Sequence, residues 1–169
     1  HISGTVNQGV YTVTLAGSAT MNTSGMTWGV ILVNGGITTL TSTLKANRIQ
    51  NNGFVDMTFA GAYGFEVNEF ALTTNFNITV TLVNGIRYLV KQSLVTNTPG
   101  YTRLFTCASG AALFDLQYGA TQNVRSTSAT RINSLGGQTI YTNVGTLTST
   151  QNWSIGTTNN NTSSFLLMF

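Results

Sequence analysis

Hydrophobic and polar residues alternate along much of this 169-residue chain with the two-residue period of a β-strand. In the segment 10–16, three apolar side chains fall on one face and two threonines on the other. The segment 27–33 is a more continuous apolar run, which predicts a strand buried on both faces. The same reasoning predicts strands at 37–44, 54–60, 65–72, 78–83, 86–90, 101–107 and 112–118.

Turn signals separate these segments and give the expected connections. Asn84-Gly85 joins two alternating runs, which predicts a tight type I′ β-hairpin. Polar residues dominate 119–139, which predicts a long surface loop with at most one edge strand, followed by short strands within 140–147 and 153–155. The apolar ending, 164–169, is expected to form a central or intersubunit strand because an exposed one would aggregate.

No repeat of 20–50 residues can be aligned along the chain. Many short strands at regular spacing are typical of antiparallel all-β domains. We therefore expect an all-β fold, an antiparallel β-sandwich of jelly-roll type, built as one domain over residues 1–169.

The composition narrows the function. The chain holds 30 Thr, 18 Asn and 18 Gly, against four carboxylates, seven Lys or Arg and one His. Proton transfer and metal binding usually need clustered ionisable groups, so we expect no enzyme activity, no metal and no cofactor. Glu66 and Glu69 lie three residues apart on a predicted strand, which would place them on opposite faces rather than in a carboxylate pair.

Charge and cysteine content bear on partners and location. The net charge is +3, but the cations are spread along the chain, which argues against a nucleic-acid-binding patch. No apolar run is long enough to predict membrane insertion. A weakly charged surface favours association between copies, so we expect a homo-oligomer. The single Cys107 excludes an intramolecular disulfide and is expected to be buried; without disulfides, an uncharged surface points to folding in a reducing compartment and work outside the cell.

Candidate contact residues lie in the polar C-terminal third. Sugar recognition combines an aromatic face with amide and hydroxyl groups, and acidic sugars add an arginine. Arg125, Arg131, Trp153 and Asn159 supply such a set, and we expect them to bind a glycan. Two alternatives stay open: Trp153 is as compatible with a buried position as with an exposed one, and each arginine is also compatible with a solvated loop charge.

Three other cations fall on predicted strands. Arg87, Lys91 and Arg103 are expected to face solvent there. They would pair with the carboxylates of Glu66, Glu69 or Asp115.

A Thr/Asn/Gly-rich, disulfide-free β-chain that ends in an apolar strand resembles the receptor-binding head of a viral fibre or spike, as in adenovirus-type fibres. The segment Thr162–Phe169 is similar in character to the closing strand of such heads, and Gly25–Trp28 and Asn34–Gly36 to their strand-turn patterns. The resemblance implies an antiparallel β-sandwich without catalytic residues. It also implies a homotrimer on the virion surface that attaches to a host cell-surface glycan or protein.

Two other functions stay open on the same observations. A jelly-roll capsid or protrusion domain would share the composition and act in assembly. A bacterial or fungal lectin or adhesin module would bind sugar even as a monomer.

Overall fold

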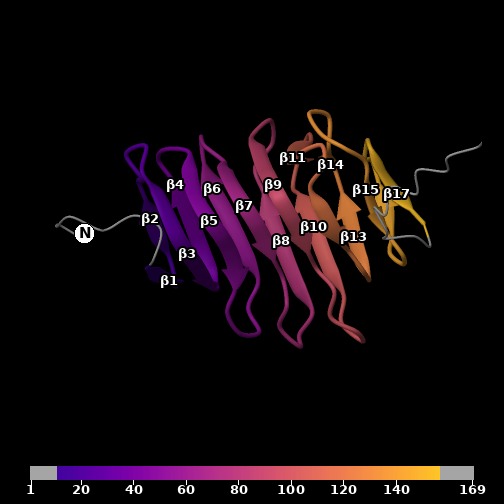
Figure 1. Cartoon of the computed structure of the whole chain (residues 1–169), viewed down its shortest axis with the longest axis horizontal. Helices are drawn as coiled ribbons and strands as arrows, with labels where there is room; N and C mark the ends of the chain where they lie inside the picture. Colours follow the sequence, from indigo (N-terminus) through magenta and orange to yellow (C-terminus); the bar gives the residue numbers. More distant parts are fainter. Residues whose placement is uncertain (1–10, 157–169) are drawn as a thin grey trace, which may run out of the picture.

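The chain winds into a β-solenoid of about seven turns, stacked along its longest axis (Figure 1). The structure is a computed structural model that describes residues 11–156. Within this range the pairs between named strands all run parallel. The expected antiparallel β-sandwich is therefore wrong, although the all-β content is confirmed.

Over most of the chain, consecutive strands enter opposite sheets, and each such pair of strands forms one turn of the solenoid. Sheet A contains, in spatial order, β1 (Thr12–Ala16), β3 (Thr27–Asn34), β5 (Leu44–Asn51), β7 (Phe65–Ala71), β9 (Arg87–Val95), β11 (Ala112–Leu116) and β14 (Ile132–Asn133), with β12 (Thr121–Asn123) also beside β9. Sheet B contains β2 (Ala19–Met21), β4 (Gly36–Leu40), β6 (Met57–Gly61), β8 (Ile78–Leu82), β10 (Arg103–Cys107), β13 (Thr127–Thr130) and β16 (Leu147–Thr148). A two-stranded sheet of β15 (Ile140–Thr142) and β17 (Trp153–Ile155) completes the last turn.

The core lies between the two sheets and is built from stacked columns of apolar side chains. On sheet A, Ile31, Ile49, Phe70 and Leu94 are in register on four successive strands, and all four are fully buried. Alternate residues along each strand point inward. Each inward position therefore stacks on the matching position of the next strand and forms one column. The predicted strand 27–33 is buried on one face only, because its outward residues stay partly exposed.

A cluster of aromatic rings fills the middle of this core. The ring centroid of Phe65 lies 5.3 Å from that of Phe59, 5.4 Å from Phe70 and 5.1 Å from Tyr88. Phe105 and Phe114 continue the cluster toward the C-terminal turns, with centroids 5.0 Å apart. Cys107 is buried beside them, as expected from its apolar setting.

The predicted hairpin at Asn84-Gly85 is wrong. Strand β8 pairs with β6 and β10 in sheet B, whereas β9 pairs with β7 and β11 in sheet A. A type I′ turn needs positive φ at both central residues, and in this turn Gly85 has φ +71° while Asn84 is not among the positive-φ residues. The chain therefore turns a corner between sheets here instead of reversing within one.

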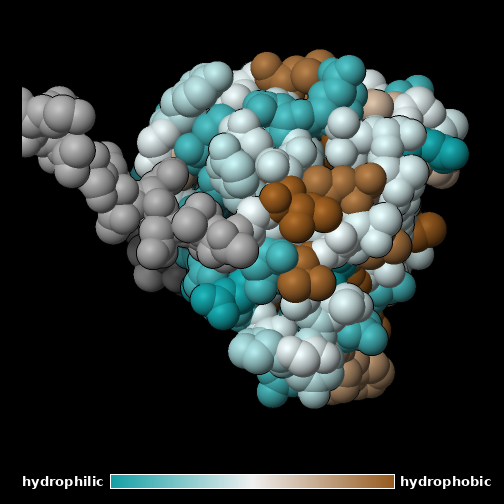
Figure 2. Space-filling view, turned by 90° about the vertical axis from the view of Figure 1, so that its right-hand side faces the viewer, coloured by the Kyte–Doolittle hydropathy of each residue, from teal (hydrophilic) through white to brown (hydrophobic). Residues whose placement is uncertain are grey.

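The segment 119–139 is also different from the expected surface loop. It contributes β12, β13 and β14, and its inward side chains complete the core. Val124, Thr127, Ala129 and Ile132 are each fully buried. The turn after β14 is the last one in the described part of the chain. Figure 2 faces this end of the solenoid and shows apolar surface near the centre of the view. Exposed apolar side chains there include Leu135, Val144 and Ile155; the predicted strand 164–169 lies outside the described residues.

Candidate binding faces

The two outer faces of the solenoid carry different chemistry, and the outer face of sheet A holds most of the charge. Its strands contribute Lys45, Arg48, Glu66, Glu69, Arg87, Lys91 and Asp115. Three ion pairs link neighbouring strands: Arg87 Nε to Asp115 Oδ2 at 2.7 Å, Lys91 Nζ to Glu66 Oε2 at 3.1 Å, and Arg48 to Glu69 at 3.5 Å. The expected pairing of Arg87 and Lys91 with strand carboxylates is confirmed.

Two expectations about these charges are wrong. Glu66 and Glu69 lie on the same outer face, because the alternation of inward and outward residues in β7 is interrupted at Asn68: Val67 and Phe70 are both fully buried, and the two residues between them are both partly exposed. Arg103 is fully buried rather than solvent-facing, and burial lowers its pKa. Its guanidinium donates to the carbonyl oxygens of Phe76, Thr74 (2.6 Å) and Thr102 (3.1 Å).

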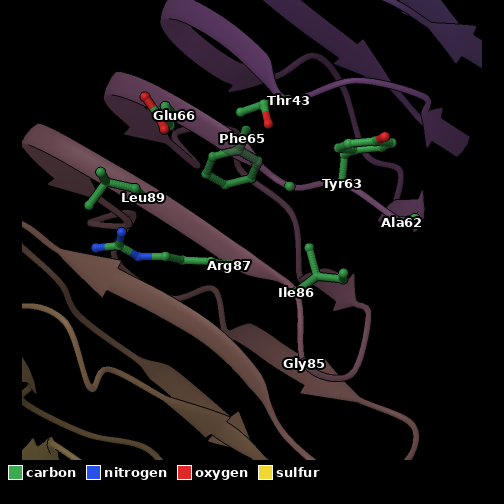
Figure 3. A pocket seen from close by; sticks show the side chains of 10 residues that line it. Thr43, Ala62, Tyr63, Phe65, Glu66, Gly85, Ile86, Arg87 and Leu89 are labelled. Atoms are coloured by element: carbon green, nitrogen blue, oxygen red, sulfur yellow. The ribbon is translucent and has the colours of Figure 1, made fainter.

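A hollow of about 210 Å³ opens beside sheet A, where the loops that lead into β5, β7 and β9 pass one another. Figure 3 shows Thr43 and Tyr63 on one side of it and Ile86 on the other, with Arg87 extending away from Tyr63. Its charged residues, Glu66 and Arg87, are both engaged in the ion pairs with Lys91 and Asp115. The lining of the hollow therefore contains a single carboxylate, that of Glu66, and no carboxylate pair.

The outer face of sheet B carries a row of threonines. Thr58, Thr81, Thr106, Thr130 and Thr148 are in register on five neighbouring strands. Within residues 11–156, their hydroxyl groups make no hydrogen bond to the protein. One step along the same face, Thr79, Leu104 and Ser128 form a second rank in register, and the amide of Thr146 donates to Ser128 Oγ at 2.9 Å. We call these two ranks the threonine face.

An exposed row of aromatic rings borders the threonine face. Phe54, Phe76 and Tyr101 come from the loops that enter β6, β8 and β10. The ring centroids of Phe54 and Phe76 lie 5.3 Å apart, and those of Phe76 and Tyr101 lie 6.4 Å apart. Phe54 is 71% exposed and Phe76 44%, although phenylalanine is usually buried. We call these three residues the aromatic row.

Buried polar side chains hold the loop that carries the middle ring. Asn51 accepts a hydrogen bond from the amide of Thr73 at 3.1 Å and donates one to the hydroxyl of Thr74. Arg103 binds the carbonyl oxygens of Thr74 and Phe76 from the next turn. The ring of Phe76 is therefore presented by a loop fixed on two sides.

Exposed polar groups run alongside the aromatic row. Asp56 Oδ1 accepts from the amide of Thr79 at 2.7 Å, and Asn77 Oδ1 accepts from the amide of Thr102 at 2.9 Å. These contacts fix both side chains, yet leave the second carboxylate oxygen of Asp56 and the amide nitrogen of Asn77 available to a ligand. An aromatic surface edged with fixed polar groups results.

The two predicted arginines do not converge. Arg125 precedes β13 and Arg131 follows it, so they lie at opposite ends of that strand, roughly 20 Å apart along an extended chain. Both are exposed, but Arg131 adopts φ +58° and its guanidinium donates to the carbonyl oxygen of Ala108 in the neighbouring turn. Arg131 therefore links two turns of the solenoid, a contact that the predicted loop did not indicate.

The predicted tryptophan lies in the core. Trp153 is 8% exposed, and its ring centroid is 5.9 Å from that of Phe105. Asn159 lies outside the described residues. The sequence alone did not predict the threonine face or the aromatic row; the Thr-x-Thr spacing at 79–81 and 146–148 was the available signal for the threonine face.

The described residues contain no group of three or more His, Cys, Asp or Glu side chains that could hold a metal ion. Nor does this part of the chain contain a helix long and apolar enough to cross a membrane. Comparison of the chain with protein-family models, with curated proteins and with solved structures finds no match.

Proposed function

We propose that this chain is a non-enzymatic recognition module that attaches to a cell-surface glycan through the aromatic row. The observation that carries the proposal is the alignment of Phe54, Phe76 and Tyr101 on three successive turns, with at least two rings substantially exposed. Exposed apolar rings cost solvation free energy, and sugar rings present the apolar C–H faces that cover them favourably.

Fixed polar groups beside the rings support the same ligand class. A sugar that stacks on Phe54 or Phe76 would bring its hydroxyl groups to the carboxylate of Asp56 and the amide of Asn77. Because hydrogen bonds to protein groups already hold these side chains, little further side-chain entropy is lost on binding. The proposed site lies on loops that stack on successive turns of a solenoid, and not on the loops of a sandwich-shaped fibre head.

The experiment is binding of the purified chain to a glycan array and to insoluble neutral polysaccharides. We expect Phe54→Ala and Phe76→Ala each to weaken binding at least tenfold, which corresponds to the loss of one stacking contact of about 1.4 kcal/mol. Tyr118→Ala is the matched control, because Tyr118 is 76% exposed and lies in another loop outside the row. Absence of glycan binding, or equal affinity for the wild-type chain and both phenylalanine variants, would refute the proposal.

Self-association remains part of the proposal. Exposed apolar side chains at the C-terminal end of the described residues, among them Val144 and Ile155, are compatible with contacts between copies. The mass of the full chain in solution tests this, and a strict monomer over a wide concentration range would refute it.

A further inference from the structure

We propose that the threonine face of sheet B is an ice-binding face, which orders water with a repeat close to that of the ice lattice. The proposal concerns a different surface from the aromatic row and does not depend on glycan binding. It rests on the spacing of the hydroxyl groups in the row from Thr58 to Thr148, their freedom from protein partners and the absence of exposed charged side chains on the strands that carry them.

Strand geometry fixes the spacing of the row. Neighbouring strands in a sheet lie about 4.8 Å apart, so the in-register threonines repeat at that distance across five strands, from Thr58 to Thr148. Alternate residues along one strand lie about 6.7 Å apart, which sets the distance between the two ranks. The first rank is thus a regular row of hydroxyl and methyl groups, and the second rank adds the hydroxyls of Thr79 and Ser128 on either side of the apolar Leu104.

The repeat of hydrogen-bonded water can be derived in the same way. Water hydrogen bonds are about 2.75 Å long, and two waters bound to a common third at the tetrahedral angle lie about 4.5 Å apart. The difference from the strand spacing is about 0.3 Å per strand. Over the four intervals of the row it accumulates to about 1 Å, which is less than half of one hydrogen-bond length. A continuous layer of tetrahedral water can therefore stay in register with the whole row.

The side-chain chemistry fits an immobilised water layer. A threonine hydroxyl donates one hydrogen bond and accepts two, and within residues 11–156 the hydroxyls of Thr58, Thr81, Thr106 and Thr130 have no protein partner. The β-branched side chain is stiff at χ1, so ordering the face for binding costs little entropy. The adjacent methyl groups limit the orientations available to the waters between them.

The threonine face lies on strands without exposed charged side chains, as binding to the neutral surface of ice requires. Ions hold hydration shells that do not fit the ice lattice, and the strands of sheet B place no charged side chain among the threonines. The charged residues on strands occupy sheet A, apart from the buried Arg103. Asp56, at the border of the face, has one carboxylate oxygen bound to the amide of Thr79. The electrostatic match is with a neutral, hydrogen-bonding surface rather than with a polyanion or a membrane.

The test is the growth of single ice crystals in solutions of the full chain on a cooled microscope stage. We expect the wild-type chain to facet the crystals and to separate their melting and growth temperatures. Thr81→Tyr and Thr106→Tyr should lose most of both effects, because a bulky ring breaks the array while tyrosine remains favourable on a β-sheet surface. Thr14→Tyr is the matched control, since Thr14 is an exposed threonine on the outer face of sheet A.

Each outcome decides the proposal. Round, freely growing crystals with the wild-type chain would overturn it, as would equal losses in Thr14→Tyr and Thr81→Tyr. If a tyrosine variant does not fold, Thr106→Val, which removes one hydroxyl and keeps the shape, should still reduce the temperature gap; an unchanged gap would overturn the assignment. If Thr81→Tyr merely dissociates a dimer and leaves ice growth unaffected, the face is a contact between copies. Glycan binding by the same variants should be unchanged. A failure of the ice-binding proposal can therefore be distinguished from a failure of the glycan-binding proposal.

Discussion

Arg103 Nη2 donates a hydrogen bond of 2.6 Å to the carbonyl oxygen of Thr74, joining β10 to the loop that follows β7. No acidic side chain accompanies this fully buried guanidinium; its described partners are the carbonyl oxygens of Thr74, Phe76 and Thr102. The positive charge is thus balanced by main-chain dipoles, and in return the loop carbonyls are satisfied where water cannot reach them.

Replacing this arginine should destabilise the protein and disturb the aromatic row together. Arg103→Met keeps much of the side-chain volume but leaves three carbonyl groups without their donor, so we expect a loss of about 3 kcal/mol in the free energy of unfolding. Urea denaturation followed by circular dichroism measures it. Because the same contact positions Phe76, glycan affinity should fall even where the variant is fully folded. A variant as stable as the wild-type chain would show that these hydrogen bonds are dispensable.

The aromatic cluster should be the most sensitive part of the core. Phe65 contacts the rings of Phe59, Phe70, Tyr88 and Phe114, and it is 1% exposed. We expect Phe65→Ala to lower the free energy of unfolding by about 3–5 kcal/mol, since a cavity forms among rigid rings. Phe54→Ala, at a position 71% exposed, should change it by about 0.5 kcal/mol or less. Similar losses in both variants would contradict the core described here.

The sequence predicted strands well and their partners poorly. Segments such as 65–72 and 78–83 are close to β7 and β8, because inward and outward residues alternate in any half-buried strand. That alternation does not distinguish a parallel neighbour from an antiparallel one. Asn84-Gly85 was interpreted as a reversal within one sheet, although the same residues serve equally well at a corner between two sheets.

The repeat escaped detection because the turns differ in length. The register offset is 18 residues between Val30 and Arg48 and 26 residues between Arg87 and Leu113. Solenoid repeats are recognised by a fixed period, and here insertions in the corners remove it while the strand positions still stack. The strand 44–51 was missed because its outward residues are polar and its alternation is interrupted, with both Asn47 and Arg48 unburied between the buried Ala46 and Ile49.

The candidate site was harder to predict than the strands. Both the threonine face and the aromatic row consist of residues 18 to 25 positions apart, which become neighbours only once the register between turns is known. Arg125 and Arg131 lie six positions apart in the sequence, yet β13 holds them at opposite ends. In a stacked fold, proximity follows the register rather than the sequence separation.

Close stacking of the corners makes a specific prediction at Gly64. A Cβ atom at this position would lie 1.8 Å from the carbonyl oxygen of Arg87 in the next turn, which is main chain and cannot move aside cheaply. We expect Gly64→Ala to cost about 3 kcal/mol of stability, measured by urea denaturation. The control is Gly119→Ala, where a Cβ meets nothing within 4 Å and the cost is the left-handed backbone alone, about 1–2 kcal/mol. Equal stability of Gly64→Ala and the wild-type chain would rule out this approach of the turns.

The buried phenol of Tyr88 should make stability fall at high pH. Burial raises the pKa of Tyr88, the hydrogen bond from the Val83 amide partly offsets that rise, and the Cys107 thiol adds to it. Above about pH 10 the unfolded phenol loses its proton while the folded one keeps it, so the folded state binds more protons and its stability decreases as pH rises toward the raised pKa. The slope for this one group approaches about 1.4 kcal/mol per pH unit.

Urea denaturation at several pH values between 9 and 11 tests this against Tyr88→Phe, which keeps the ring and removes the titrating group. We expect the variant to have a shallower pH dependence, whereas Tyr118→Phe, at an exposed site, should follow the wild-type slope. Parallel curves for the wild-type chain and Tyr88→Phe would exclude Tyr88 as the source of the alkaline destabilisation.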